Sequence, residues 1–202
     1  MEKKEVIQQT ALAFDFIQKL YFEVSYLIKE IEGLLAEEDE RFIMGRPSGY
    51  AITSRNSSGL EPNLVNLWAL KKMSVCFIPE AQTKLTGGVT NTAFDKNLNI
   101  IYLRIVLSEK EISEPHIWMG VLYDFEDKQR RWPTKFEQLM AHIEYNETRV
   151  FVDKETIDYD DTRTRFKGKL FQVNLFDINS SEDIVNLLLK PALKIYREVK
   201  TQ

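Results

Sequence analysis

The chain is poor in the side chains from which many enzyme sites are built. Its 202 residues include one cysteine and two histidines. A lone cysteine excludes an internal disulfide, and Cys76 lies in an apolar run, where a thiol is usually a small buried hydrophobe. The two histidines, His116 and His142, are far apart in the sequence and lack the spacing of zinc ligands. We therefore predict no metal centre at these residues.

Linear motifs of the common catalytic and nucleotide-binding classes are also missing. The patterns G-x-G-x-x-G, G-x-S-x-G and H-E-x-x-H do not occur, and the glycines at 87–88 lack the spacing of a phosphate-binding loop. We interpret the segments 45–59 and 83–92, which are rich in Ser, Thr, Asn and Gly, as loops with turn chemistry. The sequence therefore identifies no cofactor, and any cofactor is unknown at this stage.

The chain also lacks an excess of positive charge. The chain has 27 Lys and Arg against 31 Asp and Glu, a net charge of −4, whereas a dedicated nucleic-acid-binding protein usually has a clear basic excess. Four acidic residues at 37–40 point in different directions if helical, so we interpret them as a solvated helix end and not as a metal site. No apolar run reaches the roughly 18 residues that span a bilayer, and no secretory segment follows Met1. We expect a cytoplasmic protein without a membrane partner.

The strongest pattern that is present is an apolar row with steps of three and four residues: Val6, Thr10, Ala13, Ile17, Leu20, Val24, Leu27, Ile31 and Leu34. It predicts one long amphipathic helix over residues 1–38. The neighbouring heptad position is apolar too, where a two-stranded coiled coil normally carries charge. We therefore predict that this helix lies on the core of its own domain. Phe16, Phe22 and Tyr26 fall outside the row, and self-association through them is a further hypothesis.

The rest of the chain predicts a sheet followed by two further helices. Strands are predicted at 41–44, 50–53, 99–107, 116–125, 149–153 and 165–177. A further strand region is predicted at 64–78, with a break at 71–72. The segment 99–107 is apolar on both parities, which is typical of a central strand. Thr134 and Glu137 form a capping box for a helix at 134–146. A last helix, at 180–200, begins at Ser180 and is bent at Pro191, which cannot donate a backbone hydrogen bond.

This order of elements predicts an α+β fold in a single domain over residues 1–202. Short connections between consecutive strands favour an antiparallel or mixed sheet, with the helices packed on it. The long N-terminal helix would occupy 1–38, the sheet with its mid-chain helix 41–178, and the C-terminal helix 180–200.

The first candidate site is a row of four cations that alternate with uncharged residues: Arg163, Arg165, Lys167 and Lys169. In a strand, alternate residues share one face. Beyond Leu170 that parity becomes apolar, which a β-bulge or the end of the covered part of the sheet would explain. One hypothesis is an anion-binding strip for phosphate, nucleic acid or an acidic partner. The other is an exposed face whose charges discourage aggregation, partly neutralised by the aspartates at 158–161.

The second candidate site consists of Asp124, Glu126 and Lys128, at the end of a predicted strand. Their spacing would suit a Mg²⁺-dependent nuclease or phosphoesterase, in which carboxylates hold the metal and a lysine orients the attacking water. A further acid would be needed, and the sequence does not choose between Glu80 and Asp95. The tripeptide is common by chance and continues into a polar turn, so this is the weaker interpretation.

The missing catalytic signatures favour a non-enzymatic binding or regulatory module that forms a homo-oligomer. The alternative is the Mg²⁺-dependent nuclease or phosphoesterase that uses Glu126 and Lys128. The partners to consider are a second copy of the chain and, with less support, an anionic ligand or nucleic acid. Many active sites have no linear motif, so the sequence leaves the biochemical function open.

Overall fold

The fold is seen in a computed structural model, which describes residues 3–45, 71–108, 114–129, 135–151 and 155–201. The strands are β1 (Phe42–Gly45), β2 (Lys72–Pro79), β3 (Ile100–Val106), β4 (His116–Asp127), β5 (Thr156–Asp160) and β6 (Thr164–Asn174). The helices are α1 (Lys3–Ala36), α2 (Glu80–Thr86), α3 (Phe136–Tyr145), α4 (Glu147–Val150), α5 (Ser181–Asp183) and α6 (Lys190–Lys200). Short 3-10 turns, η2 (Val89–Asn91) and η3 (Leu175–Asp177), and a π-helical segment, η4 (Ile184–Leu189), complete them.

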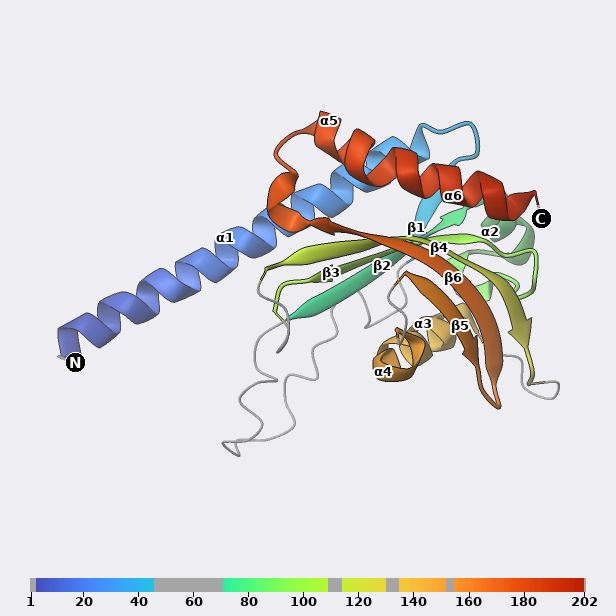
Figure 1. The fold of residues 1–202 in the computed structure, drawn as a ribbon, viewed down its shortest axis with the longest axis horizontal. Coiled ribbons are helices and arrows are strands. Elements are labelled where there is room, and N and C mark those ends of the chain that lie inside the picture. The colour runs from blue at the N-terminus through green and yellow to red at the C-terminus, as the bar shows by residue number, and fades with distance from the viewer. Residues whose placement is uncertain (1–2, 46–70, 109–113, 130–134, 152–154, 202) are drawn as a thin grey trace.

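The strands form one six-stranded antiparallel sheet in the order β1-β2-β3-β4-β6-β5. All seven residues of β3 are buried, as its apolar character on both parities predicted for a central strand. With the long N-terminal helix, the mid-chain helix and the C-terminal helix, this sheet confirms the predicted α+β fold (Figure 1).

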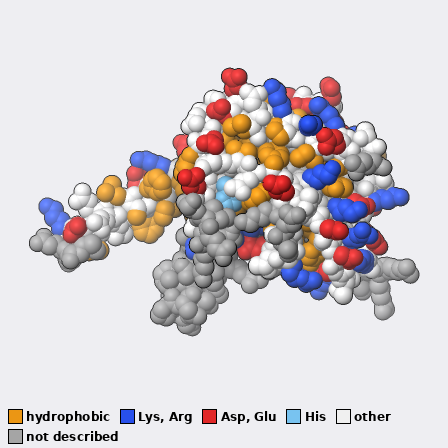
Figure 2. Space-filling view, viewed as in Figure 1, with side chains coloured by type: hydrophobic (Ala, Val, Ile, Leu, Met, Phe, Trp, Pro, Cys, Tyr) orange, Lys and Arg blue, Asp and Glu red, His pale blue; other side chains and the backbone are white. Residues whose placement is uncertain are grey.

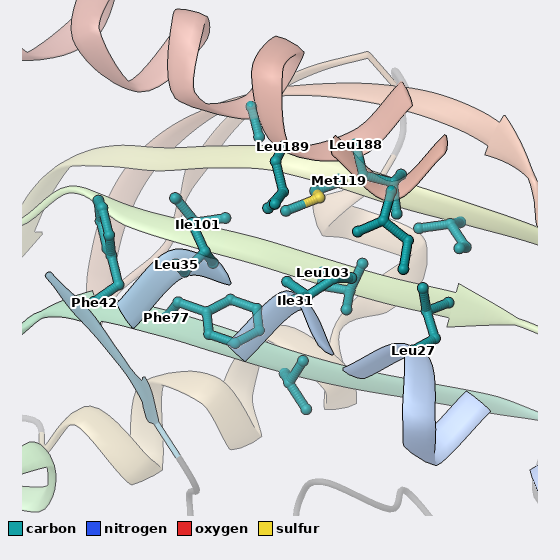
Figure 3. Close-up of a cluster of buried hydrophobic side chains, with 14 of the residues drawn as sticks. Leu27, Ile31, Leu35, Phe42, Phe77, Ile101, Leu103, Met119, Leu188 and Leu189 are labelled. Carbon is teal, nitrogen blue, oxygen red and sulfur yellow. The ribbon is translucent and has the colours of Figure 1, made fainter. Parts of the chain in front are cut away.

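One face of the sheet is covered by α1 and by the C-terminal helix. Figure 3 shows the buried hydrophobic core between them, with Leu27, Ile31 and Leu35 from α1, Leu188 and Leu189 from η4, and Phe77, Ile101, Leu103 and Met119 from the strands. The opposite face is covered by α3. The predicted apolar row of that helix, Phe136, Leu139, Met140 and Ile143, is buried there.

Helix α1 divides into two parts. From Leu20 onward, which we call the root (residues 20–36), it lies on the sheet, and Val24, Leu27, Ile31 and Leu35 are at most 8% exposed. Residues 4–19, which we call the arm, project beyond the sheet (Figure 1). The prediction that the helix lies on its own core is therefore right for the root and wrong for the arm. Within the described ranges, none of the helices has an apolar stretch sufficient to cross a lipid bilayer.

The C-terminal helix begins at Ser180, as its sequence predicts, and departs from regular α-helical geometry ahead of Pro191. The Ser180 hydroxyl accepts a hydrogen bond from the amide of Asp183 (3.2 Å), which caps the first turn. Ahead of Pro191 the helix widens into the π-helical segment η4, and the amide of Lys190 donates to the carbonyl of Val185, five residues earlier. Since Pro191 has no N–H to donate, a widened turn before it is a natural way to keep the helix continuous.

Two predictions about local structure need correction. The loop expected at 83–92 contains most of α2 and the turn η2. The strand expected at 149–153 is replaced at its start by α4, because the amides of Arg149 and Val150 donate to the carbonyl of Asn146 at 2.8 and 2.9 Å. The edge strand β5 follows instead, with Ile157 and Tyr159 buried and its other residues exposed. Thr134, the predicted strand at 50–53, residues 64–70 of the predicted strand region and nearly all of the predicted loop 45–59 lie outside the described residues.

Two glycines offer a test of the packing. A Cβ on Gly120 of β4 would lie 2.0 Å from the backbone oxygen of Lys169 on β6, whereas one on Gly33 of α1 would meet nothing within 4 Å. We expect Gly120→Ala to lower the free energy of unfolding by about 2–3 kcal/mol, because the strands must separate. Gly33→Ala should raise it by about 0.5–1 kcal/mol, because alanine favours the helix. Urea denaturation measures both, and equal effects would contradict the close approach of β4 and β6.

Candidate interaction surface and polar clusters

The arm of α1 carries large apolar side chains that face solvent. Ile7, Leu12, Phe14 and Phe16 are between 61% and 65% exposed, and Val6 is 40% exposed. Figure 2 shows hydrophobic side chains along this projecting part of the molecule. Single exposed apolar residues are ordinary, but a contiguous group on one element marks an interaction surface.

The exposed side chains of the arm continue the row that the root buries. At 3.6 residues per turn, Val6, Ala13 and Ile17 project to the same side of α1 as Val24 and Ile31, with Phe14 and Phe16 at the two borders. The charged pair of the arm, Asp15 and Lys19 (2.7 Å), lies on the other side. The arm is therefore amphipathic, and the described sheet covers only the root.

The two aromatic residues outside the row, Phe22 and Tyr26, are 63% and 65% exposed on the root. They lie on the side of α1 that faces away from its sheet, since Val24 and Leu27 face the core. The predicted self-association through Phe16, Phe22 and Tyr26 stays a prediction, but Phe16 belongs to the apolar side of the arm and not to the surface of the other two.

The predicted cationic strip lies on β6, beyond the part of the sheet that the helices cover. Arg165, Lys167 and Lys169 are half-buried and share a face with Phe171 and Val173, which pack against the core beneath α1 and α6. The pairing of β6 is continuous through Leu170. The change in polarity is thus explained by the end of helix coverage and not by a bulge.

Acidic residues surround this strip on both sides. In the register of β5 and β6, Asp158 lies opposite Lys167 and Asp160 lies opposite Arg165. On β4, a carboxylate oxygen of Asp124 lies 2.8 Å from the ammonium of Lys167, and this hydrogen bond raises the pKa of that lysine. Arg163 lies in the exposed turn between β5 and β6. Lys167 is therefore paired with an aspartate, and the strand register brings two further aspartates beside Arg165 and Lys167.

The residues of the predicted nuclease site each have a different environment. Asp124 adopts a positive φ of 55° where the register of β4 and β6 shifts, and its side chain pairs with Lys167. Glu126 is exposed opposite Arg165. The ammonium of Lys128 contacts the carboxylate of Asp160 and the backbone oxygen of Asp161.

The two acids considered as further ligands are held elsewhere. Glu80 pairs with Lys84 (2.9 Å), and the carboxylate of Asp95 accepts a hydrogen bond from the amide of Asn97 (2.9 Å). In the part of the chain that the structure describes, no three His, Cys, Asp or Glu side chains come together as a possible metal site.

A polar cluster that the sequence did not predict joins α3 to the turn after β5. His142 Nε2 lies 2.7 Å from Asp161 Oδ2 and 2.9 Å from the hydroxyl of Tyr159. The other oxygen of Asp161 accepts hydrogen bonds from the amides of Thr164 (2.7 Å) and Arg163 (2.8 Å). The carboxylate of Asp161 therefore stabilises the β5–β6 turn and also binds the side chain of His142 on α3. We call these residues the His142 cluster.

The neighbours of His142 determine which ring nitrogen carries the proton in the neutral side chain. The side-chain nitrogen of Asn146 donates to the backbone oxygen of His142 (2.9 Å), which identifies it as the amide nitrogen, and it lies 3.2 Å from His142 Nδ1. Nδ1 therefore accepts, and in neutral His142 the proton is on Nε2, facing Asp161. Both ring nitrogens have protein partners, so this histidine is placed as a structural link and not as an available general base.

The pKa values of this cluster follow from burial and hydrogen bonding. Burial opposes ionisation of Asp161, but the hydrogen bonds from Thr164, Arg163, His142 and Tyr159 outweigh it and hold the pKa of Asp161 below its ordinary value. Burial and the neighbouring Asp161 carboxylate raise the pKa of Tyr159 to about 12. Tyr159 therefore stays protonated and Asp161 stays ionised at neutral pH.

A second unpredicted cluster lies on the same face of the sheet. Arg104, buried on β3, contacts the carboxylate of Glu147, which also lies 3.2 Å from the ammonium of Lys72. The guanidinium of Arg104 stacks over the ring of Phe151 at 4.4 Å. A buried charge is tolerated only when it is paired, so Glu147 is needed to hold Arg104 in the sheet. We call these residues the Arg104 cluster.

Cys76 and His116 are both buried. Burial raises the pKa of the Cys76 thiol, which donates toward the backbone oxygen of Gly45 at 3.6 Å. Its predicted role as a small buried hydrophobe is thereby confirmed. His116 Nδ1 lies 3.2 Å from the backbone oxygen of Glu114, and its Nε2 has no hydrogen-bond partner among the described residues.

Comparison with known proteins adds nothing to these observations. No protein family, curated protein or solved structure matches the chain. Function therefore has to be argued from the geometry of the arm and of the polar clusters.

The neutralisation of the cationic strip can be tested by changing its acidic neighbours. We expect Asp158→Asn/Asp160→Asn to increase retention on heparin, because the change frees cations on β6. The control, Asp177→Asn/Glu182→Gln, alters net charge equally at exposed positions elsewhere and should have a smaller effect. Strong retention of the wild-type chain that is lost in Arg165→Ala/Lys167→Ala would instead support an anion-binding strip.

The His142 cluster predicts a pH-dependent contribution to stability. Because the pKa of Asp161 is lower in the folded chain, its contribution is complete above the ordinary carboxyl pKa near 4 and is lost as the pH falls through the folded value. We expect Asp161→Asn to lower the free energy of unfolding by about 1–2 kcal/mol at neutral pH, and by progressively less in acid. Urea titrations at several pH values measure this difference. Asp177→Asn, at an exposed position, is the control, and an equal pH dependence in both variants would contradict the assignment.

Proposed function

We propose that this protein is a non-enzymatic binding module that associates with protein surfaces through the arm of α1. The observation that carries the proposal is the exposed apolar side of the arm, with Val6, Ile7, Phe14 and Phe16 in solvent on the helix that closes the core further along. A helix that lays its apolar side on another surface is a common mode of protein recognition.

The amount of exposed surface supports an interaction role. A buried aromatic side chain covers about 150–250 Å², so the two phenylalanines and the aliphatic residues of the arm leave roughly 500 Å² of apolar surface in water. A continuous apolar patch of this size is near the upper end of what monomeric proteins expose, and such patches are often functional.

The contacts of the polar clusters support a structural role for these side chains better than a catalytic one. Both ring nitrogens of His142 are engaged, Arg104 is paired with Glu147, and Lys128 is held by Asp160. The alternative function, a Mg²⁺-dependent nuclease or phosphoesterase using Glu126 and Lys128, has no supporting contact in the described ranges. Mg²⁺-dependent cleavage of nucleic acid that disappears in Glu126→Ala would establish it. A single, buried thiol is compatible with the reducing conditions of the cytoplasm. We include a cytoplasmic location in the proposal.

A solvatochromic dye attached to the arm tests whether it docks on a protein. The native Cys76 is 0% exposed and should not react, so Phe14→Cys and Gln8→Cys can be labelled selectively. Gln8 is exposed and lies on the side of the arm opposite Ala13 and Ile17. We expect a blue shift of the dye at position 14, and little shift at position 8, in concentrated pure protein or in extract from the producing cells.

The two labels share the same background and helix, so nonspecific adsorption should affect them equally. A dye at position 14 that stays in a water-like environment under both conditions would contradict a docking arm. Equal blue shifts at both positions would contradict it as well, because they would indicate adsorption around the whole helix.

A further inference from the structure

The direction of the exposed side of the arm restricts what can cover it. The apolar row runs without interruption from the arm into the root, where it meets the sheet. The uncovered part of the row therefore faces the same side of α1 as the sheet of its own molecule. Any element that covers the arm must lie directly beyond the edge of that sheet (Figure 1).

We infer that this element is the arm of a second copy of the chain, lying antiparallel across a two-fold axis. The inference rests on the proposed docking role of the arm and names its partner. A parallel second helix would run toward the root and would collide with the sheet of the first molecule. An antiparallel helix leads away from it and places the two sheets at opposite ends of the pair. A two-fold arrangement also lets the same apolar surface serve both chains.

The residues of the arm fit such a pairing. Over residues 4–19 an α-helix is about 24 Å long, at a rise of about 1.5 Å per residue. If the two chains overlap over residues 6–20, the two-fold axis passes near Ala13. A small side chain there lets the helices approach, and Val6 of one chain then lies near Leu20 of the other. Phe14 meets its own counterpart beside the axis.

The charges of the arm are compatible with self-pairing. When Ala13 is assigned to heptad position d, the charged residues of the arm fall at the outward positions b, c and f. These residues are Lys4, Glu5, Asp15 and Lys19. No charged residue between 6 and 20 falls at a core or border position of the contact. A second copy can therefore approach without placing like charges against each other, and the association should depend little on salt.

The surface available is sufficient for a dimer. If each arm contributes roughly 500 Å² of apolar surface, the pair buries about 1,000 Å², which is near the lower limit for a specific interface. An interface of this size is in the range of weak to moderate affinity. The dimer should accordingly form in a concentration-dependent manner.

Light scattering and sedimentation of the purified full chain test the association. We expect the mass of two chains at high concentration, falling to that of one on dilution. Phe14→Glu should weaken dimerisation at least tenfold, whereas Gln8→Glu, which adds the same charge on the opposite side of the arm, should have little effect. Both side chains are exposed, so both variants should keep the thermal midpoint of the parent at concentrations where the chain is monomeric. A strict monomer, or equal weakening in both variants, would overturn the inference.

Disulfide trapping tests the orientation. Under oxidising conditions Ala13→Cys should form a covalent dimer, because position 13 is close to its own counterpart, whereas Val6→Cys should not. Efficient cross-linking of both variants would indicate parallel helices and would overturn the antiparallel arrangement. Absence of cross-linking in Ala13→Cys would do the same.

The two proposals can fail separately. A purified chain that stays monomeric, combined with a blue shift of the dye at position 14 only in cell extract, would keep the docking role and reject the second copy as its partner. A water-like dye in pure protein and in extract would reject both.

Discussion

The packing of the α1 root against the sheet is the contact on which the rest of the arrangement depends. Val24, Leu27, Ile31 and Leu35 close one face of the sheet together with the C-terminal helix. Because α1 is one continuous helix, the same contact sets where its first half points. The arm continues the root as a helix, so its exposed apolar side has a defined direction. This direction carries the argument for an antiparallel partner.

The opposite face of the sheet is organised by charged side chains as well as by apolar packing. The corner between α3 and α4 supplies His142 and Asn146 to one cluster and Glu147 to the other. Each cluster joins this corner to strands that are distant in sequence. Burying charge is costly unless its partner is in place, so these contacts are sensitive to how the corner is positioned. They explain why polar residues lie deep on this face without requiring a catalytic role for them.

Much of the fold could be predicted because the signals are local. The apolar row of α1, the double-sided apolar character of β3 and the Ser180 cap are properties of neighbouring residues, and the structure bears them out. The polar clusters could not be predicted in the same way. Nothing near Arg104 in the sequence points to Glu147, and Asp161 meets His142 only after the chain has turned back. The alternation of Ile157 and Tyr159 with polar residues is a local signal of β5 that the predicted strands at 149–153 and 165–177 do not include.

By itself the sequence determined the types of the main elements, the α+β class and the existence of a long amphipathic helix. Periodicity and capping act over a few residues, so they can be read without knowing the fold. Only the tertiary structure decided which part of the apolar row is covered, and that the cations of β6 lie among aspartates. Both depend on the extent of the sheet and on strand register, which bring together residues that are distant in the chain. The unpaired apolar side of the arm is thus a property of the folded molecule and not of the row alone.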